Sequence, residues 1–173
     1  MHISVHMTEE DYIKFNEHSF WNSSIGKKQY RMVKYGVPIL AFAVLFILWF
    51  GFDADDLTAI IIAVIFAVYT VFRNLRLKKY FEKNIRKSVM YSKKDGKLPY
   101  SEYSELEFGD EYIVETDETT VKKVRYSDLV SVGYTEEHIF VYNGAYTAFV
   151  IPRRCMADNG AALTALLEEK TGK

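Results

Sequence analysis

Two uncharged apolar stretches, residues 35–52 and 57–72, constrain the fold more than any other feature of this chain. Neither stretch contains Asp, Glu, Lys or Arg, so the 22 basic and 23 acidic side chains all lie elsewhere. As helices they would span about 27 and 24 Å, close to the roughly 30 Å hydrocarbon core of a bilayer. We therefore predict two transmembrane helices. The alternative is a buried helical hairpin in a soluble protein, which needs a core that the polar remainder does not readily supply.

The charges around these stretches predict an orientation. The connection at residues 53–56 carries three Asp and no basic residue, which favours a turn outside the hydrocarbon. The outer flanks, residues 27–34 and 73–87, contain only basic residues apart from Glu82 among their charged side chains. Because Lys and Arg flanks stay on the cytoplasmic side, both termini are expected in the cytoplasm. The first apolar stretch follows a long polar segment, so we expect it to be retained and not cleaved as a signal peptide.

A basic connector follows the second apolar stretch. Residues 73–97 contain ten Lys or Arg and two acidic residues. Leu77, Phe81, Ile85 and Val89 recur at four-residue spacing, which predicts that the second helix continues over residues 73–87. The simplest role of the charges is to set topology, and a second role is attraction to anionic lipid. The candidate lipid contacts are Arg73, Arg76, Lys78, Lys79, Lys83, Arg86 and Lys87.

The remainder of the chain shows strand patterns. Residues 2–7 alternate between polar and apolar, and Thr8 precedes three acidic residues as a helix N-cap would. Asn143-Gly144 is a hairpin signal because both residue types tolerate positive φ. A C-terminal helix is expected from Asp158 or Asn159 through about Lys170. Six strands are expected near residues 101–108, 111–116, 119–125, 129–134, 138–142 and 145–151.

Three short motifs carry a resemblance to a known family: Thr8–Tyr12, Tyr126–Leu129 and Tyr146–Arg154. With the order of the predicted elements, they resemble the YcxB-like family of bacterial membrane proteins, whose C-terminal module is similar to a bacterial pleckstrin-homology-like (PH-like) domain. The resemblance implies two membrane helices and a cytosolic PH-like domain, and it supplies no catalytic residues. The loop that is basic in phosphoinositide-binding PH domains corresponds to Gly109–Glu111, which is acidic here. Phosphoinositide binding through that loop is therefore not expected.

The predicted fold class is α+β, a two-helix transmembrane hairpin followed by a small PH-like antiparallel β domain closed by a C-terminal helix. The expected segments are a cytoplasmic N-terminal segment, the hairpin, the basic connector and the PH-like domain, at residues 1–34, 35–72, 73–97 and 98–173.

No catalytic, cofactor-binding or metal-binding residues are predicted. The chain has no P-loop, no GxGxxG and no GxSxG, and none of its four histidines stands in a metal-ligand pattern. Cys155 is the single cysteine, for which a buried structural role is expected. The net charge of −1 excludes a uniformly basic nucleic-acid binder.

These observations predict a non-enzymatic, two-span protein of the bacterial cytoplasmic membrane. Its PH-like domain is expected to bind a protein in signalling, regulation or assembly. The expected partners are the lipid bilayer, an unidentified protein and a second copy of the chain. Two alternatives remain: an oligomeric transport or channel component built from the hairpins, or an anionic-lipid sensor acting through the basic connector.

Overall fold

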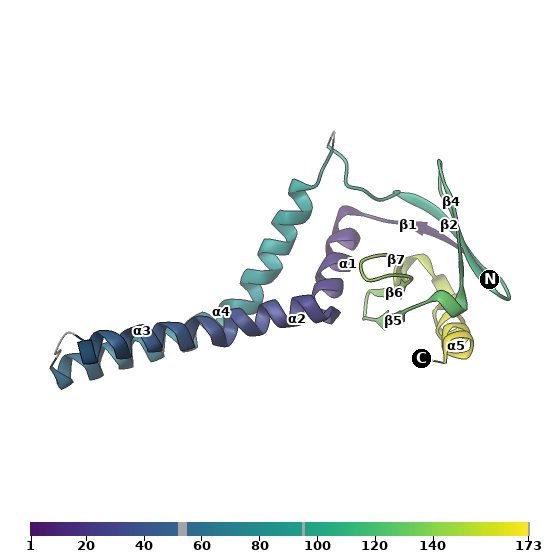
Figure 1. The fold of residues 1–173 in the computed structure, drawn as a ribbon. Coiled ribbons are helices and arrows are strands. Elements are labelled where there is room, and N and C mark those ends of the chain that lie inside the picture. The colour runs from purple at the N-terminus through teal and green to yellow at the C-terminus, as the bar shows by residue number, and fades with distance from the viewer. Residues whose placement is uncertain (52–54, 95, 173) are drawn as a thin grey trace. The chain divides into compact units, whose positions relative to one another are not determined.

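The computed structural model of the protein describes residues 1–51, 55–94 and 96–172 (Figure 1). It confirms the α+β class, with two long apolar helices followed by antiparallel sheets and a C-terminal helix. The chain divides into two compact units, Met1–Ser19 with Val89–Lys173 and Phe20–Ser88.

A four-stranded antiparallel sheet opens the first unit, with strand order β1-β2-β3-β4. The strands are β1 (His2–His6), β2 (Tyr103–Phe108), β3 (Tyr112–Thr116) and β4 (Val121–Arg125). The predicted alternation of β1 is confirmed, because Ile3 and Val5 are buried while the residues between them are exposed. The sequence pattern predicted this strand as part of a separate N-terminal segment, residues 1–34. The structure instead pairs it with β2, with Ile3 opposite Leu106.

A second antiparallel sheet consists of β5 (Ser131–Tyr134), β6 (His138–Tyr142) and β7 (Ala148–Pro152). Helix α5 (Gly160–Thr171) follows it. Both sheets and α5 contribute to one core, whose fully buried side chains include Ile113, Phe149 and Leu163. Burying each such side chain contributes about 1.5–3 kcal/mol. The described strands form two separate sheets and do not close into a barrel.

All six predicted C-terminal strands are present, each beginning one to three residues later than expected except β6. The hairpin at Asn143-Gly144 also exists, but its turn is wider than a two-residue turn. The Asn143 N–H donates to the Thr147 carbonyl at 3.1 Å, so the loop spans residues 143–147. Neither Asn143 nor Gly144 has a positive φ, so the wider loop does not need the conformation that favoured this pair.

Helix α1 (Glu9–Asn22) covers the other face of the three-stranded sheet. Thr8 caps it as predicted: the Asp11 N–H donates to Thr8 Oγ1, and the Thr8 N–H donates to Asp11 Oδ2. Phe15 of α1 packs against Phe140 and Tyr142 of β6. All five residues of β6 are buried, because the core covers one face of this strand and α1 the other.

The second unit is helical. It contains α2 (Ser24–Arg31), a π-helical turn η1 (Met32–Gly36), α3 (Val37–Gly51) and most of α4 (Asp56–Tyr91). Ser23 starts α2 because its Oγ accepts from the Gly26 N–H at 3.0 Å. A Cβ on Gly26 would lie 2.0 Å from the Phe20 carbonyl oxygen, so this tight approach requires glycine. Helix α4 continues past residue 87, as predicted, and ends at Tyr91 within the basic connector.

Two helical stretches, Ser24–Gly51 and Asp56–Tyr91, are long and apolar enough to cross a membrane. The most apolar windows of these stretches are 6% and 0% buried. A core hairpin of a soluble protein would be mostly buried, so this exposure argues against that alternative. Phe52, Asp53 and Ala54, which belong to the predicted first span and turn, lie outside the described residues.

Candidate functional site

A buried ionic cluster joins α1 to the end of β7. Asp11, which is 3% exposed, accepts hydrogen bonds from His138 Nε2 at 2.7 Å and from both terminal nitrogens of Arg154, at 2.8 and 2.5 Å. Burial raises the pKa of the Asp11 carboxyl. The hydrogen bonds from Arg154, His138 and Thr8 outweigh this effect and hold that pKa well below its usual value. Asp11 is therefore a charged anchor for α1.

An aromatic stack lies beside this cluster. The His138 ring stacks on Phe140, the His18 ring lies 4.6 Å from Phe140, and His18 Nδ1 is 2.7 Å from the Tyr142 hydroxyl. Ser19 Oγ is 3.1 Å from the same hydroxyl. Burial lowers the pKa of His18, and the electrostatic interaction with the nearby His138 ring lowers it further. Two of the four histidines thus hold α1 on β6.

The cluster has a structural role: it holds α1 in place. Both oxygens of Asp11 are already occupied by protein donors, so they have little capacity to bind a ligand. Within the ranges that the structure describes, no group of three or more His, Cys, Asp or Glu side chains is placed to hold a metal ion.

Cys155 is half-buried, whereas a buried thiol was predicted. Its Sγ lies 3.5 Å from the His6 nitrogen and accepts from that N–H. The turn that follows Pro152 brings Cys155 and Arg154 over the end of β1, which leaves the thiol only partly covered.

The four sheet edges differ in how they are protected. At the edge of β1, Arg154 donates to the His6 carbonyl at 2.8 Å, so side chains of η3 (Arg153–Cys155) cover this end of the strand. Strand β4 carries Lys122, Lys123 and Arg125 among its five residues. Charged side chains on an edge discourage pairing with another strand. The edges of β1 and β4 are therefore poor docking sites for a further strand.

The two remaining edges belong to β7 and β5. Strand β7 ends in Pro152, which has no N–H, and its Val150 is buried. Strand β5 has the sequence Ser-Val-Gly-Tyr, without charge or proline. Among the described strands only β6 pairs with it, so its second edge is open and unprotected.

The open edge of β5 presents two backbone positions. The Thr135 N–H donates to the His138 carbonyl, which marks this pair as hydrogen-bonded. Because hydrogen-bonded residues alternate along an antiparallel strand, the backbone N–H and C=O groups of Ser131 and Gly133 point toward β6. Those of Val132 and Tyr134 point away from β6, toward the open edge. This open edge was not predicted from the sequence. The available signal was the absence of charge in β5, in contrast with β4.

The seven basic residues predicted to contact lipid all lie on α4. Arg73 is half-buried and its Nη2 donates to the Val33 carbonyl of η1 at 3.0 Å. Lys78 Nζ lies 3.8 Å from the Glu82 carboxylate. The other five side chains are exposed: Arg76, Lys79, Lys83, Arg86 and Lys87.

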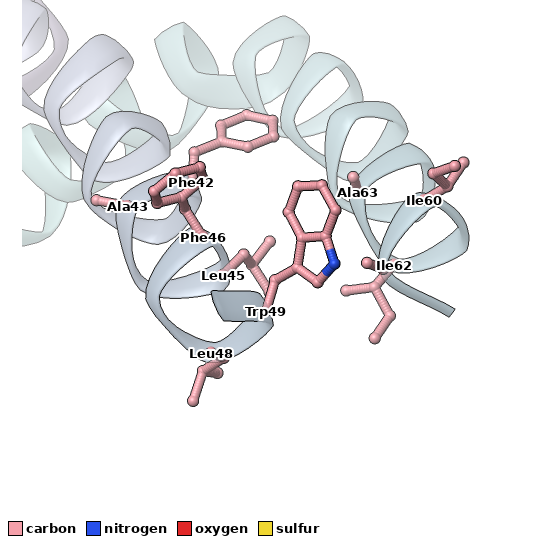
Figure 2. Close-up of a pocket in the computed structure, with 10 residues that line it drawn as sticks. Phe42, Ala43, Leu45, Phe46, Leu48, Trp49, Ile60, Ile62 and Ala63 are labelled. Atoms are coloured by element: carbon pink, nitrogen blue, oxygen red, sulfur yellow. The ribbon is translucent and has the colours of Figure 1, made fainter. Parts of the chain in front are cut away.

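An apolar pocket of about 740 Å³ lies between α3 and α4. Figure 2 shows the Trp49 ring in the space between the two helices, near Ala63 of α4. Phe46 and Ile62 also line it, and none of the described residues that line it has an ionisable side chain. These described side chains give the pocket an apolar lining of the kind that suits hydrocarbon.

These features define an α+β protein that carries two helices long and apolar enough to span a membrane. Residues 108–168 match the family model described as YcxB-like protein, which confirms the resemblance over that region. The match runs from the last residue of β2 into α5. No curated protein and no solved structure matches the chain.

Proposed function

We propose that this chain is a non-enzymatic integral protein of the bacterial cytoplasmic membrane, with two transmembrane helices and both termini in the cytoplasm. The exposed apolar faces of α3 and α4 support insertion. Basic flanks on both outer sides and acidic residues at the connection support the orientation.

The domain that this anchor presents is PH-like. Four strands, then three strands, then a C-terminal helix form its two sheets and closing helix, and this order supports the assignment. In this proposal β1 is the first strand of the domain, and the hairpin is an insertion between β1 and β2.

The function is to bind a partner protein by strand addition along β5, and the open edge of β5 carries this proposal. An extended segment added there would pair with the outward N–H and C=O groups of Val132 and Tyr134. Glu136 and Glu137 are exposed beside this edge, and residues 98–173 contain seven basic and fourteen acidic side chains. An uncharged strand flanked by Lys or Arg is therefore the partner segment that fits.

Proline at the open edge tests the proposal. Tyr134→Pro removes an outward N–H without breaking a β5–β6 hydrogen bond, so it should abolish strand addition and leave the fold intact. Val121→Pro is the matched control, because Val121 is exposed on the edge of β4 and its N–H also points outward.

The full-length protein, with a photo-crosslinking residue at Ser131, is irradiated in native membranes. We expect a specific adduct that persists with Val121→Pro and disappears with Tyr134→Pro. The captured protein, once purified and added back, should slow amide hydrogen exchange at Val132 and Tyr134. An adduct that is insensitive to Tyr134→Pro, or protection confined to other strands, would overturn the β5 assignment.

A further inference from the structure

Helix α4 has two different faces beyond the apolar span. Leu77, Phe81 and Ile85 lie on one side of it, where Leu77 is buried and the other two are half-buried. The Phe81 ring packs at 5.4 Å from Phe20 and at 5.7 Å from Tyr30. This side of α4 is therefore occupied by its own chain.

The opposite side is basic. At about 100° of rotation per residue, five basic side chains fall within an arc of roughly 100°, centred nearly opposite Phe81. Glu82 is the only acidic residue of α4 beyond Phe72, and it lies outside this arc. All five side chains are exposed. We call them the basic face: Arg76, Lys79, Lys83, Arg86 and Lys87.

The two remaining candidates lie outside the basic face. Arg73 donates to the Val33 carbonyl, which ties α4 to the π-helical turn η1. Lys78 lies about 130° from the centre of the basic face and is next to Glu82. The structure thus separates the seven candidates, which the sequence alone treated alike.

We propose that the basic face of α4 binds the phosphate groups of anionic lipids in the membrane that its own helices cross. The face continues directly from the apolar stretch that ends at Phe72, with Arg76 about 6 Å and Lys87 about 22 Å further along the helix. This continuity and the single sign of charge favour a lipid surface over a soluble partner. The inference rests on the proposed membrane insertion, and it is independent of the β5 edge.

Contact by the far end of this face requires that part of α4 to lie close to the membrane surface. Surface attraction decays within a Debye length, about 8 Å at physiological salt. If α4 projected away from the surface, only Arg76 and Lys79 would feel the headgroups. Each basic side chain near the surface favours the docked state about fivefold, so the last three together contribute on the order of a hundredfold.

The full-length protein tests the proposal in lipid nanodiscs. Cys155→Ser removes the native thiol, and Ser88→Cys carries a fluorophore whose energy transfer to a headgroup-labelled lipid reports the height of α4. Nanodiscs of phosphatidylcholine alone are compared with nanodiscs that also contain phosphatidylglycerol, at low and at high salt. We expect closer approach with phosphatidylglycerol at low salt, reversed by high salt.

Two triple variants with equal net charge distinguish lipid binding by the basic face from non-specific attraction of any positive charge to the membrane. Neutralising Lys83, Arg86 and Lys87 to Gln or Asn should abolish the effect of phosphatidylglycerol. Neutralising Lys78, Lys94 and Lys97, which are exposed but outside the basic face, should preserve it. Equal loss in both triples would overturn the proposal in favour of non-specific attraction. No effect of phosphatidylglycerol on the parent protein would overturn it in favour of an acidic protein surface.

Insertion is measured on the same protein as resistance to extraction from vesicles by alkaline carbonate. Extraction of the parent protein would refute the membrane spans and this inference together. Retention without an effect of phosphatidylglycerol would refute this inference alone.

Discussion

Asp11 and Arg154 form a bidentate ion pair that joins the first turn of α1 to the segment after β7. The two residues are 143 positions apart in the chain. They belong to the motifs Thr8–Tyr12 and Tyr146–Arg154, on which the family resemblance was based. Each motif thus supplies one residue of the ion pair that holds α1 on the three-stranded sheet.

Arg154→Met should destabilise the first unit by about 2 kcal/mol. Removing one partner of a buried pair leaves a charge without compensation, and the cost is reduced here because the Arg154 side chain is 48% exposed. Hydrogen exchange of the β6 amides under urea measures the loss. Asp11→Asn in the same chain should recover part of it, since the uncompensated carboxylate is then removed.

Arg153→Met is the matched control for this experiment. Its Nε donates to the Thr135 carbonyl at 2.9 Å, without an acidic partner among the hydrogen bonds of the described residues. A loss with Arg154→Met no greater than that with Arg153→Met would contradict the role of the ion pair.

Local patterns were enough to place most elements. Six C-terminal strands, α5 and the extension of α4 follow from alternation, turn residues and four-residue spacing, which act within a few positions of the chain. The pairing of β1 with β2 was not predictable in the same way, because about 100 residues separate Ile3 from Leu106. The Asp11–Arg154 pair and the open edge of β5 also depend on tertiary neighbours that no local pattern describes.

Gly133→Ala should cost about 1–3 kcal/mol, because a Cβ at this position would lie 2.4 Å from His18 Cε1. The His18 ring has little freedom to move, since it lies between Phe140 and the Tyr142 hydroxyl. The free energy of unfolding in urea checks this cost. Gly160→Ala is the control and should be nearly neutral, as nothing lies within 4 Å of the added Cβ.

A second substitution, at His18, distinguishes a clash with the His18 ring from a general inability of β5 to accept a side chain at residue 133. In a His18→Ala background, Gly133→Ala should cost much less than in the parent chain. Equal cost in both backgrounds would show that the His18 ring is not what excludes a side chain at Gly133.

Stability should fall as pH decreases from 7 toward 5, because of His18. The pKa of His18 in the folded chain is lowered, first by burial and then by its electrostatic interaction with His138, so the unfolded chain binds a proton more readily. The stabilisation that comes from neutral His18 is therefore complete when the pH is above 6.5, the ordinary pKa of histidine. It is lost as the pH falls below that value. The lowered pKa of Asp11 affects stability only nearer its ordinary value of 3.8, so the two effects are separable.

His18→Gln should flatten the dependence of unfolding free energy on pH between 7 and 5, while His2→Gln should retain it. His2 is a suitable control because it lies on the exposed face of β1. A parent protein with constant stability over this range would refute the assignment, as would an unchanged slope in His18→Gln.

The orientation of the hairpin predicts which side of the membrane each end of α4 faces. Asp56 begins α4 next to the acidic connection, and Lys94 follows α4 after the basic face. In a Cys155→Ser background, Asp56→Cys should react with an impermeant maleimide on intact cells, and Lys94→Cys only after the cells are permeabilised. The physical reason is that Lys and Arg resist translocation, whereas the acidic connection lacks them. The Cys155→Ser chain without an added cysteine sets the background, and labelling of Lys94→Cys in intact cells would reverse the proposed topology.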